Sequence, residues 1–437
     1  MSQALSRSVR LGYGSGSVAT GAFGTVPGLM LLPYLTDSLG IAALSAGLIV
    51  LLPKAWDVVL NPIAGRVSDR TVDARGPRRP WLLRAGLLLA ACFALLFAAP
   101  EMATGLEAAW VLVFFLAAAS AYAFFQVPYV AMPAEITSSY DERTRLMTWR
   151  VAILAFTIML AGATAPVIRD AVGGRAGYRV MGVVMALVIV VGVVAAYVGT
   201  RGAPVGRVEP GPGTLRDQLR IVAGARDFRM LLTTYVVQAL ATGCMLAGVD
   251  YLAEDVLGRK GATTILFVCF VGPALLLTPA WAALGTRLGK RTGYFLSSCV
   301  LAAGALAAVV ARSAPAGVVF AAVAVVGVGY AGCQVFPLAM LPDAAAVDAQ
   351  RTGSSRVGVY TGVWTAAETF GLALGPGVFA LVLAIGGYES STGGDVVQSS
   401  GALTAITLGF SLLPAALVLV SLWWLRQYTL DAQEVAR

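Results

Sequence analysis

The chain has 437 residues, of which 58% are hydrophobic and only 12% are charged, and its formal net charge is +8. Soluble globular domains carry about 25% charged residues, so this composition excludes an ordinary soluble fold and indicates a membrane protein. Histidine is absent, which removes imidazole from any metal, proton-relay or triad mechanism and argues against an enzyme.

Apolar stretches long enough to cross a hydrocarbon core of about 30 Å recur from residue 13 to residue 425. The polar start of the chain is followed by no small-residue cleavage pattern, so we expect the first helix to be retained. Transmembrane β-strands would alternate apolar and polar residues, and these stretches do not. The sequence therefore predicts an all-α membrane protein. The twelve predicted transmembrane helices are 13–36, 41–65, 81–99, 108–132, 148–168, 179–199, 230–253, 262–285, 293–311, 316–341, 357–386 and 402–425.

The longest polar connection, 200–229, is rich in proline and arginine and divides the chain into two halves. We expect an N-terminal six-helix bundle at 1–199, a cytoplasmic linker at 200–229 and a C-terminal six-helix bundle at 230–437. Two pseudo-symmetric six-helix bundles joined in this way are typical of the major facilitator fold, in which the halves rock about a site near the membrane midplane.

Most of the 31 Lys and Arg residues fall on the side of the membrane that holds both termini. By the positive-inside rule both termini are cytoplasmic, in a bacterial-type cytoplasmic (inner) membrane. The positive charge therefore follows from topology and needs no nucleic-acid partner. The expected partners are the lipid bilayer and a small-molecule substrate, and we expect a monomer.

The predicted loop between the second and third helices reads GRVSDRT and then RGPRRPW. This pattern resembles the signature loop of the major facilitator superfamily. The resemblance implies a conformational latch, formed by Gly65, Asp69, Arg70 and Arg79, that locks in one state and is released in another. A weaker copy at 285–291, after the eighth helix, lies where a second repeat would place it.

Ionisable side chains inside the membrane are candidates for function because each costs about 2.5–3.5 kcal/mol at the bilayer centre. Lys54, Asp57 and Asn61 lie at i, i+3 and i+7, so they share one face of the second helix. This face predicts a cation or proton site. The alternative is a Lys54–Asp57 salt bridge that only holds helices together.

Glu368 has no basic neighbour within its own predicted helix, and Trp364 lies one turn before it. An isolated carboxylate of this kind suits a group that takes up and releases a proton, unless Lys54 or Arg150 neutralises it. Gln126, with tyrosines one turn before and after it, offers hydrogen bonds and aromatic surface to a small polar ligand. Interhelical packing is the alternative role for those tyrosines.

The motifs Tyr34-Leu35-Thr36-Asp37, Trp56-Asp57, Asn61-Pro62 and Arg79-Pro80-Trp81 follow one another through the first three helices, and Gln126-Val127-Pro128-Tyr129 lies in the fourth. Together they resemble the glycoside/pentoside/hexuronide:cation symporter family, the family of melibiose carriers. The resemblance covers most of the chain and is weaker in the second half.

The resemblance implies that Asp57 is the first sodium-binding carboxylate and that Lys54 is the basic position beside it. Three departures concern the same site. Asn61 stands where the family has its second cation carboxylate, Leu60 replaces an asparagine, and Ala123 replaces a threonine ligand. On this resemblance, a sodium site of the family type is dismantled.

The resemblance also places Arg150 in the sugar site. The sugar-binding carboxylates of the first and fourth helices fall on Gly21 and Gln126, the stacking tryptophan falls on Val130, and a lysine of the eleventh helix falls on Glu368. The family's way of holding sugar hydroxyls is therefore altered.

We expect alternating-access transport of a small organic solute, coupled to a proton through Asp57 or Glu368 or else uncoupled, with no cofactor. An exporter or carrier of drugs, lysophospholipids or other amphiphiles is the alternative, and sodium-coupled sugar symport ranks third. The residues predicted to bind substrate are Gly21, Gln126, Tyr129, Arg150, Tyr360 and Trp364.

Overall fold

The computed structural model describes residues 5–73, 76, 78–137, 140–203, 223–259, 261–352, 357–392 and 396–430. These residues are almost entirely helical, and none of them lies in a strand. The chain divides into two compact units, Met1–Gly211 with Ser390–Val396, and Pro212–Glu389 with Val397–Arg437. The short segment Ser390–Val396 therefore belongs with the first unit, although the chain before and after it belongs to the second. In this segment, the Ser391 N–H donates to the Thr36 carbonyl at 2.8 Å.

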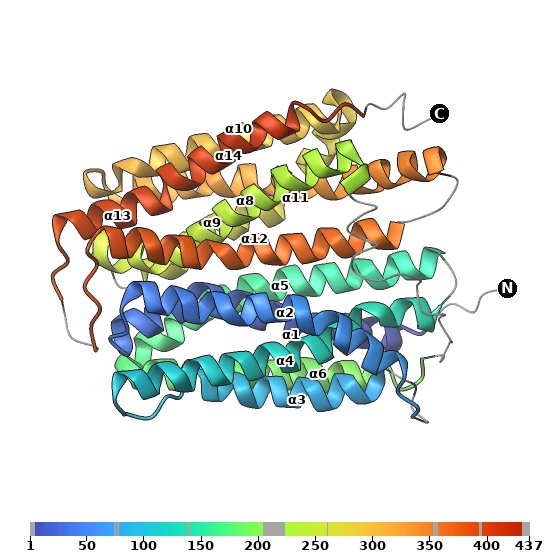
Figure 1. Ribbon diagram of the computed structural model, residues 1–437, viewed down its shortest axis with the longest axis horizontal. Helices are drawn as coiled ribbons and strands as arrows, with labels where there is room; N and C mark the ends of the chain where they lie inside the picture. The colour runs from blue at the N-terminus through green and yellow to red at the C-terminus, as the bar shows by residue number, and fades with distance from the viewer. Residues whose placement is uncertain are drawn as a thin grey trace. The chain divides into compact units, whose positions relative to one another are not determined.

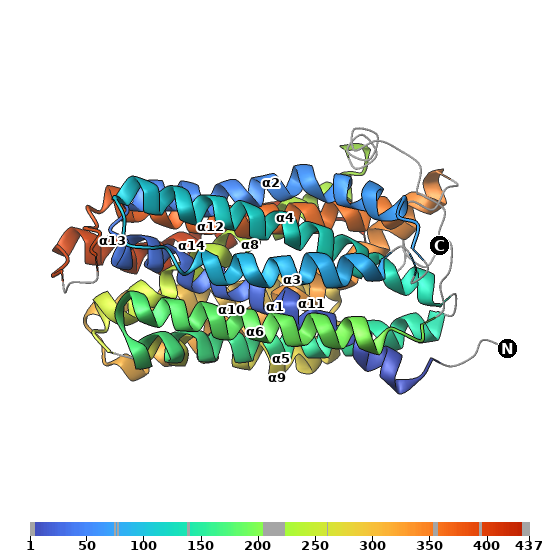
Figure 2. The same cartoon turned by 90° about the horizontal axis from the view of Figure 1, so that it is seen from below.

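The first unit is a bundle of long helices that run alongside one another (Figure 1). Helix α1 packs against α5 and α6, α2 packs against α4, and α3 packs against α4 and α6. Figure 2 shows α4 running beside α2 and α3. The described helices of this unit are α1 (Arg7–Pro33), continued by a π-helical turn (Tyr34–Ser38), α2 (Ala43–Asp69), α3 (Arg79–Leu96), α4 (Thr104–Ile136), α5 (Tyr140–Val172) and α6 (Gly174–Gly199).

The second unit repeats this plan. Its first helix, α8, packs against α12 and α14, α9 packs against α11, and α10 packs against α11 and α14. The described helices are α8 (Arg226–Tyr251), continued by a π-helical turn (Leu252–Val256), α9 (Ala262–Leu288), α10 (Lys290–Ala307), continued by a 3₁₀ turn (Ala308–Arg312), α11 (Ala316–Thr352), α12 (Val357–Ile385), α13 (Ser400–Phe410) and α14 (Leu412–Leu425).

Each helix pair of the first unit therefore has a counterpart in the second, so that α1–α5 corresponds to α8–α12 and α2–α4 corresponds to α9–α11. The opening helix of each unit also ends in a π-helical turn, at Tyr34–Ser38 and at Leu252–Val256. This repetition agrees with the predicted pair of pseudo-symmetric six-helix bundles.

Eleven of the described helical segments are long and apolar enough to cross a membrane. Helix α2, which carries Lys54 and Asp57, is the further long helix at a predicted transmembrane position. Two helices extend furthest beyond their predicted ends: α5 begins at Tyr140 rather than 148, and α11 continues to Thr352 rather than 341. Hydropathy detects only the part of a helix in hydrocarbon, whereas backbone hydrogen bonding continues into the polar region.

The last predicted helix, 402–425, is broken at Ser411 into α13 and α14. Pro414 lies in the first turn of α14. In an unbroken helix its ring would clash with the carbonyl of Phe410, and its nitrogen has no hydrogen to donate to that carbonyl. A bend at this position is therefore the expected consequence of the sequence.

Small residues allow close contact between the backbones of paired helices in both units. A Cβ atom added at Gly12 of α1 would clash with Gly199 of α6, and one added at Gly243 of α8 would clash with the Leu372 carbonyl of α12. Membrane helices associate largely through such packing, because lipid supplies no hydrophobic drive between them.

Candidate functional site

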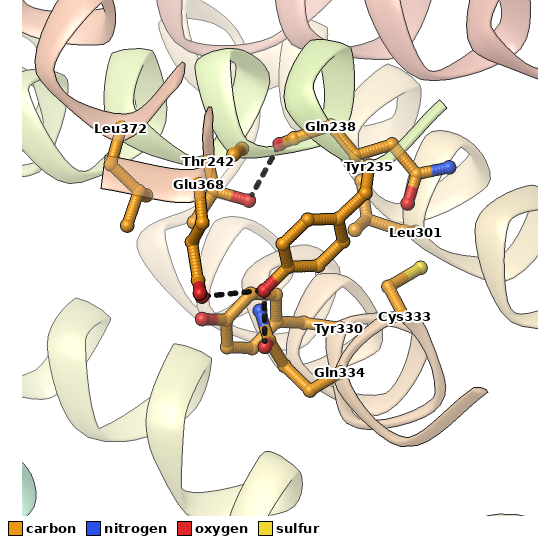
Figure 3. Close-up of a pocket in the computed structure, with 10 residues that line it drawn as sticks. Tyr235, Gln238, Thr242, Leu301, Tyr330, Cys333, Gln334, Glu368 and Leu372 are labelled. Atoms are coloured by element: carbon orange, nitrogen blue, oxygen red, sulfur yellow. Dashed lines mark hydrogen bonds between the residues drawn. The ribbon is translucent and has the colours of Figure 1, made fainter. Parts of the chain in front are cut away.

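A small polar cavity lies inside the second unit, between α8, α10, α11 and α12 (Figure 3). Its volume of about 10 Å³ is the room occupied by one water molecule. The polar groups around it come from Tyr235 of α8, Tyr330 and Gln334 of α11, and Glu368 of α12. Figure 3 shows the polar ends of these four side chains directed toward one point.

Glu368 is the only carboxyl group among the residues that line this cavity in the described structure. The Tyr235 hydroxyl lies 2.6 Å from Glu368 Oε1 and 3.1 Å from Gln334 Oε1, as donor to either acceptor. No Lys or Arg of the described chain lines the cavity, and no ion pair joins Glu368 to any described residue. Within this unit, Glu368 therefore has hydroxyl and amide neighbours and no counter-charge.

Aromatic rings hold Tyr235 in place. The Trp364 ring stacks on it with centroids 4.5 Å apart, and Phe228 contacts both Trp364 and Tyr360. Tyr360 and Trp364 are both fully buried, and the Trp364 indole N–H has no hydrogen-bond acceptor in the described chain. The two predicted substrate-binding rings thus pack against α8 in this structure.

In the first unit, Asp57 is 4% exposed and its Oδ1 atom has no hydrogen-bond partner among the described residues. The Lys54 ammonium lies over the Phe23 ring, 5.2 Å from its centroid. The described residues include no Lys54–Asp57 ion pair within 4.0 Å, so the alternative of a helix-holding salt bridge does not apply here. Neither side chain has an ion-pair partner among the described residues.

A second polar group lies where α1, α4 and α5 meet. Thr20 donates to Gln126 Oε1 at 2.7 Å, and the buried Tyr129 hydroxyl donates to the Tyr13 carbonyl at 2.8 Å. The Arg150 guanidinium lies 5.5 Å from the centroid of the Tyr129 ring, and its Nε atom is buried without a partner among the described residues. The Tyr129 ring therefore packs against the Arg150 guanidinium, and the Arg150 Nε–H keeps no acceptor among the described residues.

Gly21 was expected to bind substrate, but it is buried at a contact between α1 and α5. A Cβ atom there would clash with the Thr157 side chain. Gly21 is therefore a helix-packing residue in this structure and does not join the polar group of Gln126 and Arg150.

Two of the three altered sodium-ligand positions, Leu60 and Ala123, lie in an apolar cluster between α2 and α4. Leu60 and Ala123 are buried together with Ala64, and Phe124 and Val127 pack against them. Asn61, the next residue along α2, is exposed. Hydrocarbon groups thus stand at two positions where the resemblance to sodium symporters expects oxygen ligands.

The sequence matches the family described as MFS/sugar transport protein over residues 12–432. The chain belongs to this family. The chain is 24% identical to the inner membrane symporter YicJ of Escherichia coli, over 96% of this chain and 91% of that protein. The putative glycoside/cation symporter YagG of E. coli is also 24% identical, over 97% of this chain and 93% of its own length. The resemblance to glycoside/cation symporters is therefore confirmed.

A sodium-dependent lysophosphatidylcholine symporter of Danio rerio is likewise 24% identical, over 94% of this chain and 83% of that protein. Among solved structures, a bacterial homologue of the human lysosomal transporter Spinster has a TM-score of 0.69 at 14% identity and covers 96% of this chain. The nucleoside transporter NupG has a TM-score of 0.67 at 13% identity and covers 95%. These structures share the fold, and the protein is a secondary active transporter rather than an enzyme.

The signature loop contains the four residues of the predicted latch. Arg79 is buried and donates to the Tyr197 carbonyl of α6 at 2.9 Å, whereas Arg70 is exposed and Gly65 is half-buried. The side chain of Asp69 lies outside the described part of the structure. Among the predicted latch residues whose side chains the structure describes, Arg79 therefore links two helices.

The neighbouring Arg78, which the sequence reasoning did not select, forms a buried ion pair in the loop. Its Nε atom pairs with Glu135 at 2.7 Å, and its Nη1 atom donates to Ser68 at 2.7 Å. The arginine and carboxylate side chains are 9% and 8% exposed. This contact joins the ends of α2, α3 and α4.

The echo at 285–291 makes the equivalent contacts in the second unit. Lys290 pairs with Asp343 of α11 at 2.6 Å, and Arg291 donates to the Arg426 carbonyl after α14 at 2.7 Å. The two loops are therefore repeats in structure as well as in sequence.

Tyr235, Tyr330 and Gln334 are the site residues that sequence reasoning missed. Tyrosine and glutamine are uncharged, so they do not stand out in an apolar helix as Glu368 does. Their signal is spatial, because Tyr235 and Glu368 are 133 positions apart and meet only when α8 packs on α12.

Proposed function

We propose that this transporter moves a small organic solute by alternating access and couples the movement to protons rather than to sodium. The observation that carries the proposal is the apolar cluster that includes Leu60 and Ala123, two of the three positions at which the expected sodium ligands are altered. Na⁺ is a hard cation that needs several oxygen ligands, and these side chains offer none. Uncoupled transport is the alternative.

Two carboxylates are suited to carry the proton. Asp57 and Glu368 lie within the helical bundles and form no ion pair among the described residues. A charged group in such surroundings costs about 2.5–3.5 kcal/mol even on the mildest scale, and proton binding to a carboxylate removes that cost. Lys54, half-buried on α2, would moderate the charge of Asp57.

The solute would contact the polar group around Gln126 and Arg150, because the Arg150 Nε atom is a buried donor without a partner among the described residues. Neither Gly21 nor Gln126 supplies a carboxylate for sugar hydroxyls, which supports a solute other than a simple glycoside. A lysophospholipid or another amphiphile is the second candidate, and the similarity to the lysophosphatidylcholine symporter favours it. Sodium-coupled sugar symport ranks third.

We propose a bacterial-type inner membrane for this transporter, with both termini in the cytoplasm, and a monomer as its working unit. The excess of Lys and Arg on one side of the predicted topology supports the orientation. The relative YicJ is an inner membrane symporter, which supports the location.

The experiment has two stages. A thermal-shift screen of glycosides, hexuronates and lysophospholipids against the purified transporter identifies a ligand, and proteoliposome uptake of that ligand is then measured under pH or sodium gradients. Accumulation driven by a pH gradient, and unchanged when choline replaces sodium, supports the proposal. Accumulation driven by a sodium gradient alone contradicts it.

A further inference from the structure

We infer that Tyr235 and Gln334 form a proton-binding site with Glu368, in which Tyr235 transmits the protonation of Glu368 from α12 to α11. The inference rests on the proposed proton coupling and names the residues that would carry it. The observation behind it is that one hydroxyl contacts two oxygen acceptors, at 2.6 Å and 3.1 Å.

A tyrosine hydroxyl has one hydrogen, so Tyr235 can donate to Glu368 or to Gln334 but not to both. With a neutral Glu368, both short contacts are hydrogen bonds, because the carboxyl O–H donates to Tyr235 Oη and the Tyr235 O–H donates to Gln334 Oε1. With a charged Glu368, Tyr235 turns its hydrogen to the carboxylate, and Gln334 must rotate its amide to offer Nε2 instead. With Gln334 Oε1 facing Tyr235, the neutral acid satisfies both contacts.

The exposure of Glu368 and Tyr235 fits this assignment. The Glu368 side chain is half-buried, so it can exchange a proton with water, whereas Tyr235 is 3% exposed and reaches water only through its neighbours. The stacked Trp364 ring fixes the plane of Tyr235. Tyr235 is therefore a positioning residue whose hydrogen reports the state of the carboxyl group.

The titratable groups around Glu368 are few. Helix α8 presents Tyr235, helix α11 presents Tyr330 and Cys333, and α13 has no titratable side chain in its sequence. Within the described part of this unit, no cation faces Glu368 from these helices. The hydrogen bonds with Tyr235 and Gln334 therefore decide how a proton on Glu368 is held.

The chain of contacts connects helices that otherwise pack separately. Helix α12 packs mainly against α8, whereas α11 packs mainly against α9 and α10 and touches α8 and α12 little. Loss of the proton from Glu368 withdraws the Tyr235 hydrogen from Gln334 and so weakens the link from α8 to α11. Such a change can couple protonation to a rearrangement of helices.

Infrared difference spectroscopy of the purified transporter in the Asp57→Asn background tests the inference without any transport measurement. We expect a carboxyl C=O band that disappears in Glu368→Gln and shifts in Tyr235→Phe, which removes the hydrogen bond. Gln334→Leu should also shift the band, although Gln334 meets Glu368 only through Tyr235. Tyr294→Phe is the matched control, since this buried hydroxyl has no described partner, and it should leave the band unchanged.

Absence of any band that depends on Glu368, or a Glu368 band that neither Tyr235→Phe nor Gln334→Leu shifts, overturns the inference. Proteoliposome uptake gives the independent measure. If the wild type accumulates no ligand under a pH gradient, the proposed function fails, and the infrared band still decides the site. If it does accumulate ligand, Tyr235→Phe and Glu368→Gln should lose accumulation but keep ligand exchange, and unchanged accumulation in both variants contradicts the inference.

Discussion

The ion pair between Arg78 and Glu135 should be the most costly contact of the signature loop to break. Both side chains are more than nine-tenths buried, and the two charged groups lie 2.7 Å apart. Removing one member of a buried pair leaves the other charge uncompensated, which costs about 3–5 kcal/mol. In Glu135→Gln, the amide oxygen and Ser68 can still accept from Arg78, so we expect a loss near the low end, about 3 kcal/mol.

Thermal and denaturant unfolding in detergent, relative to wild type, measure this loss. Glu389→Gln is the matched control, because it removes the same charge from an exposed side chain. The double variant Arg78→Gln/Glu135→Gln should be less destabilised than the sum of the single variants, with a coupling of about 0.5–3 kcal/mol. A Glu135→Gln variant within about 0.5 kcal/mol of the control would refute the reasoning.

Three further predictions concern the helical bundles. In a thermal-shift assay, Gly243→Ala should lower stability by about 1–3 kcal/mol, because the added Cβ meets the backbone of α12. Its control, Gly24→Ala, should be neutral or stabilising, because no atom lies within 4 Å of the added Cβ. Leu60→Asn combined with Ala123→Thr should create a thermal shift with NaCl over choline chloride that wild type lacks, and a sodium shift in wild type would count against the apolar-cluster argument. Asp57→Asn should leave the melting temperature unchanged or raise it, because no described residue bonds Oδ1; a clear drop would show that Asp57 has a structural partner.

The helices could be predicted from the sequence because lipid imposes a single requirement, an apolar run of sufficient length. The eleventh predicted helix, 357–386, agrees with α12 to within one residue. The prediction was less accurate where that requirement ends, as at the polar start of α5, 140–147. The break at Ser411 depends on a local cause, Pro414, that hydropathy averages away.

The candidate site was only partly predictable. Asp57 and Glu368 stand out because a charge inside the membrane is anomalous, and the sequence alone reveals it. Tyr235 and Gln334 acquire a role only through the packing of α8, α11 and α12 around Glu368. The opposite holds for Gly21, whose place in the family pattern suggested a ligand contact but whose surroundings are filled by Thr157.

Proton-driven uptake is the most direct test of the central claim. Proteoliposomes containing the wild-type transporter should accumulate the ligand found in the thermal-shift screen when an inward pH gradient is imposed, equally well in sodium and in choline buffers. Glu368→Gln should abolish this accumulation. Accumulation driven by an inward sodium gradient at equal pH on both sides would contradict the claim.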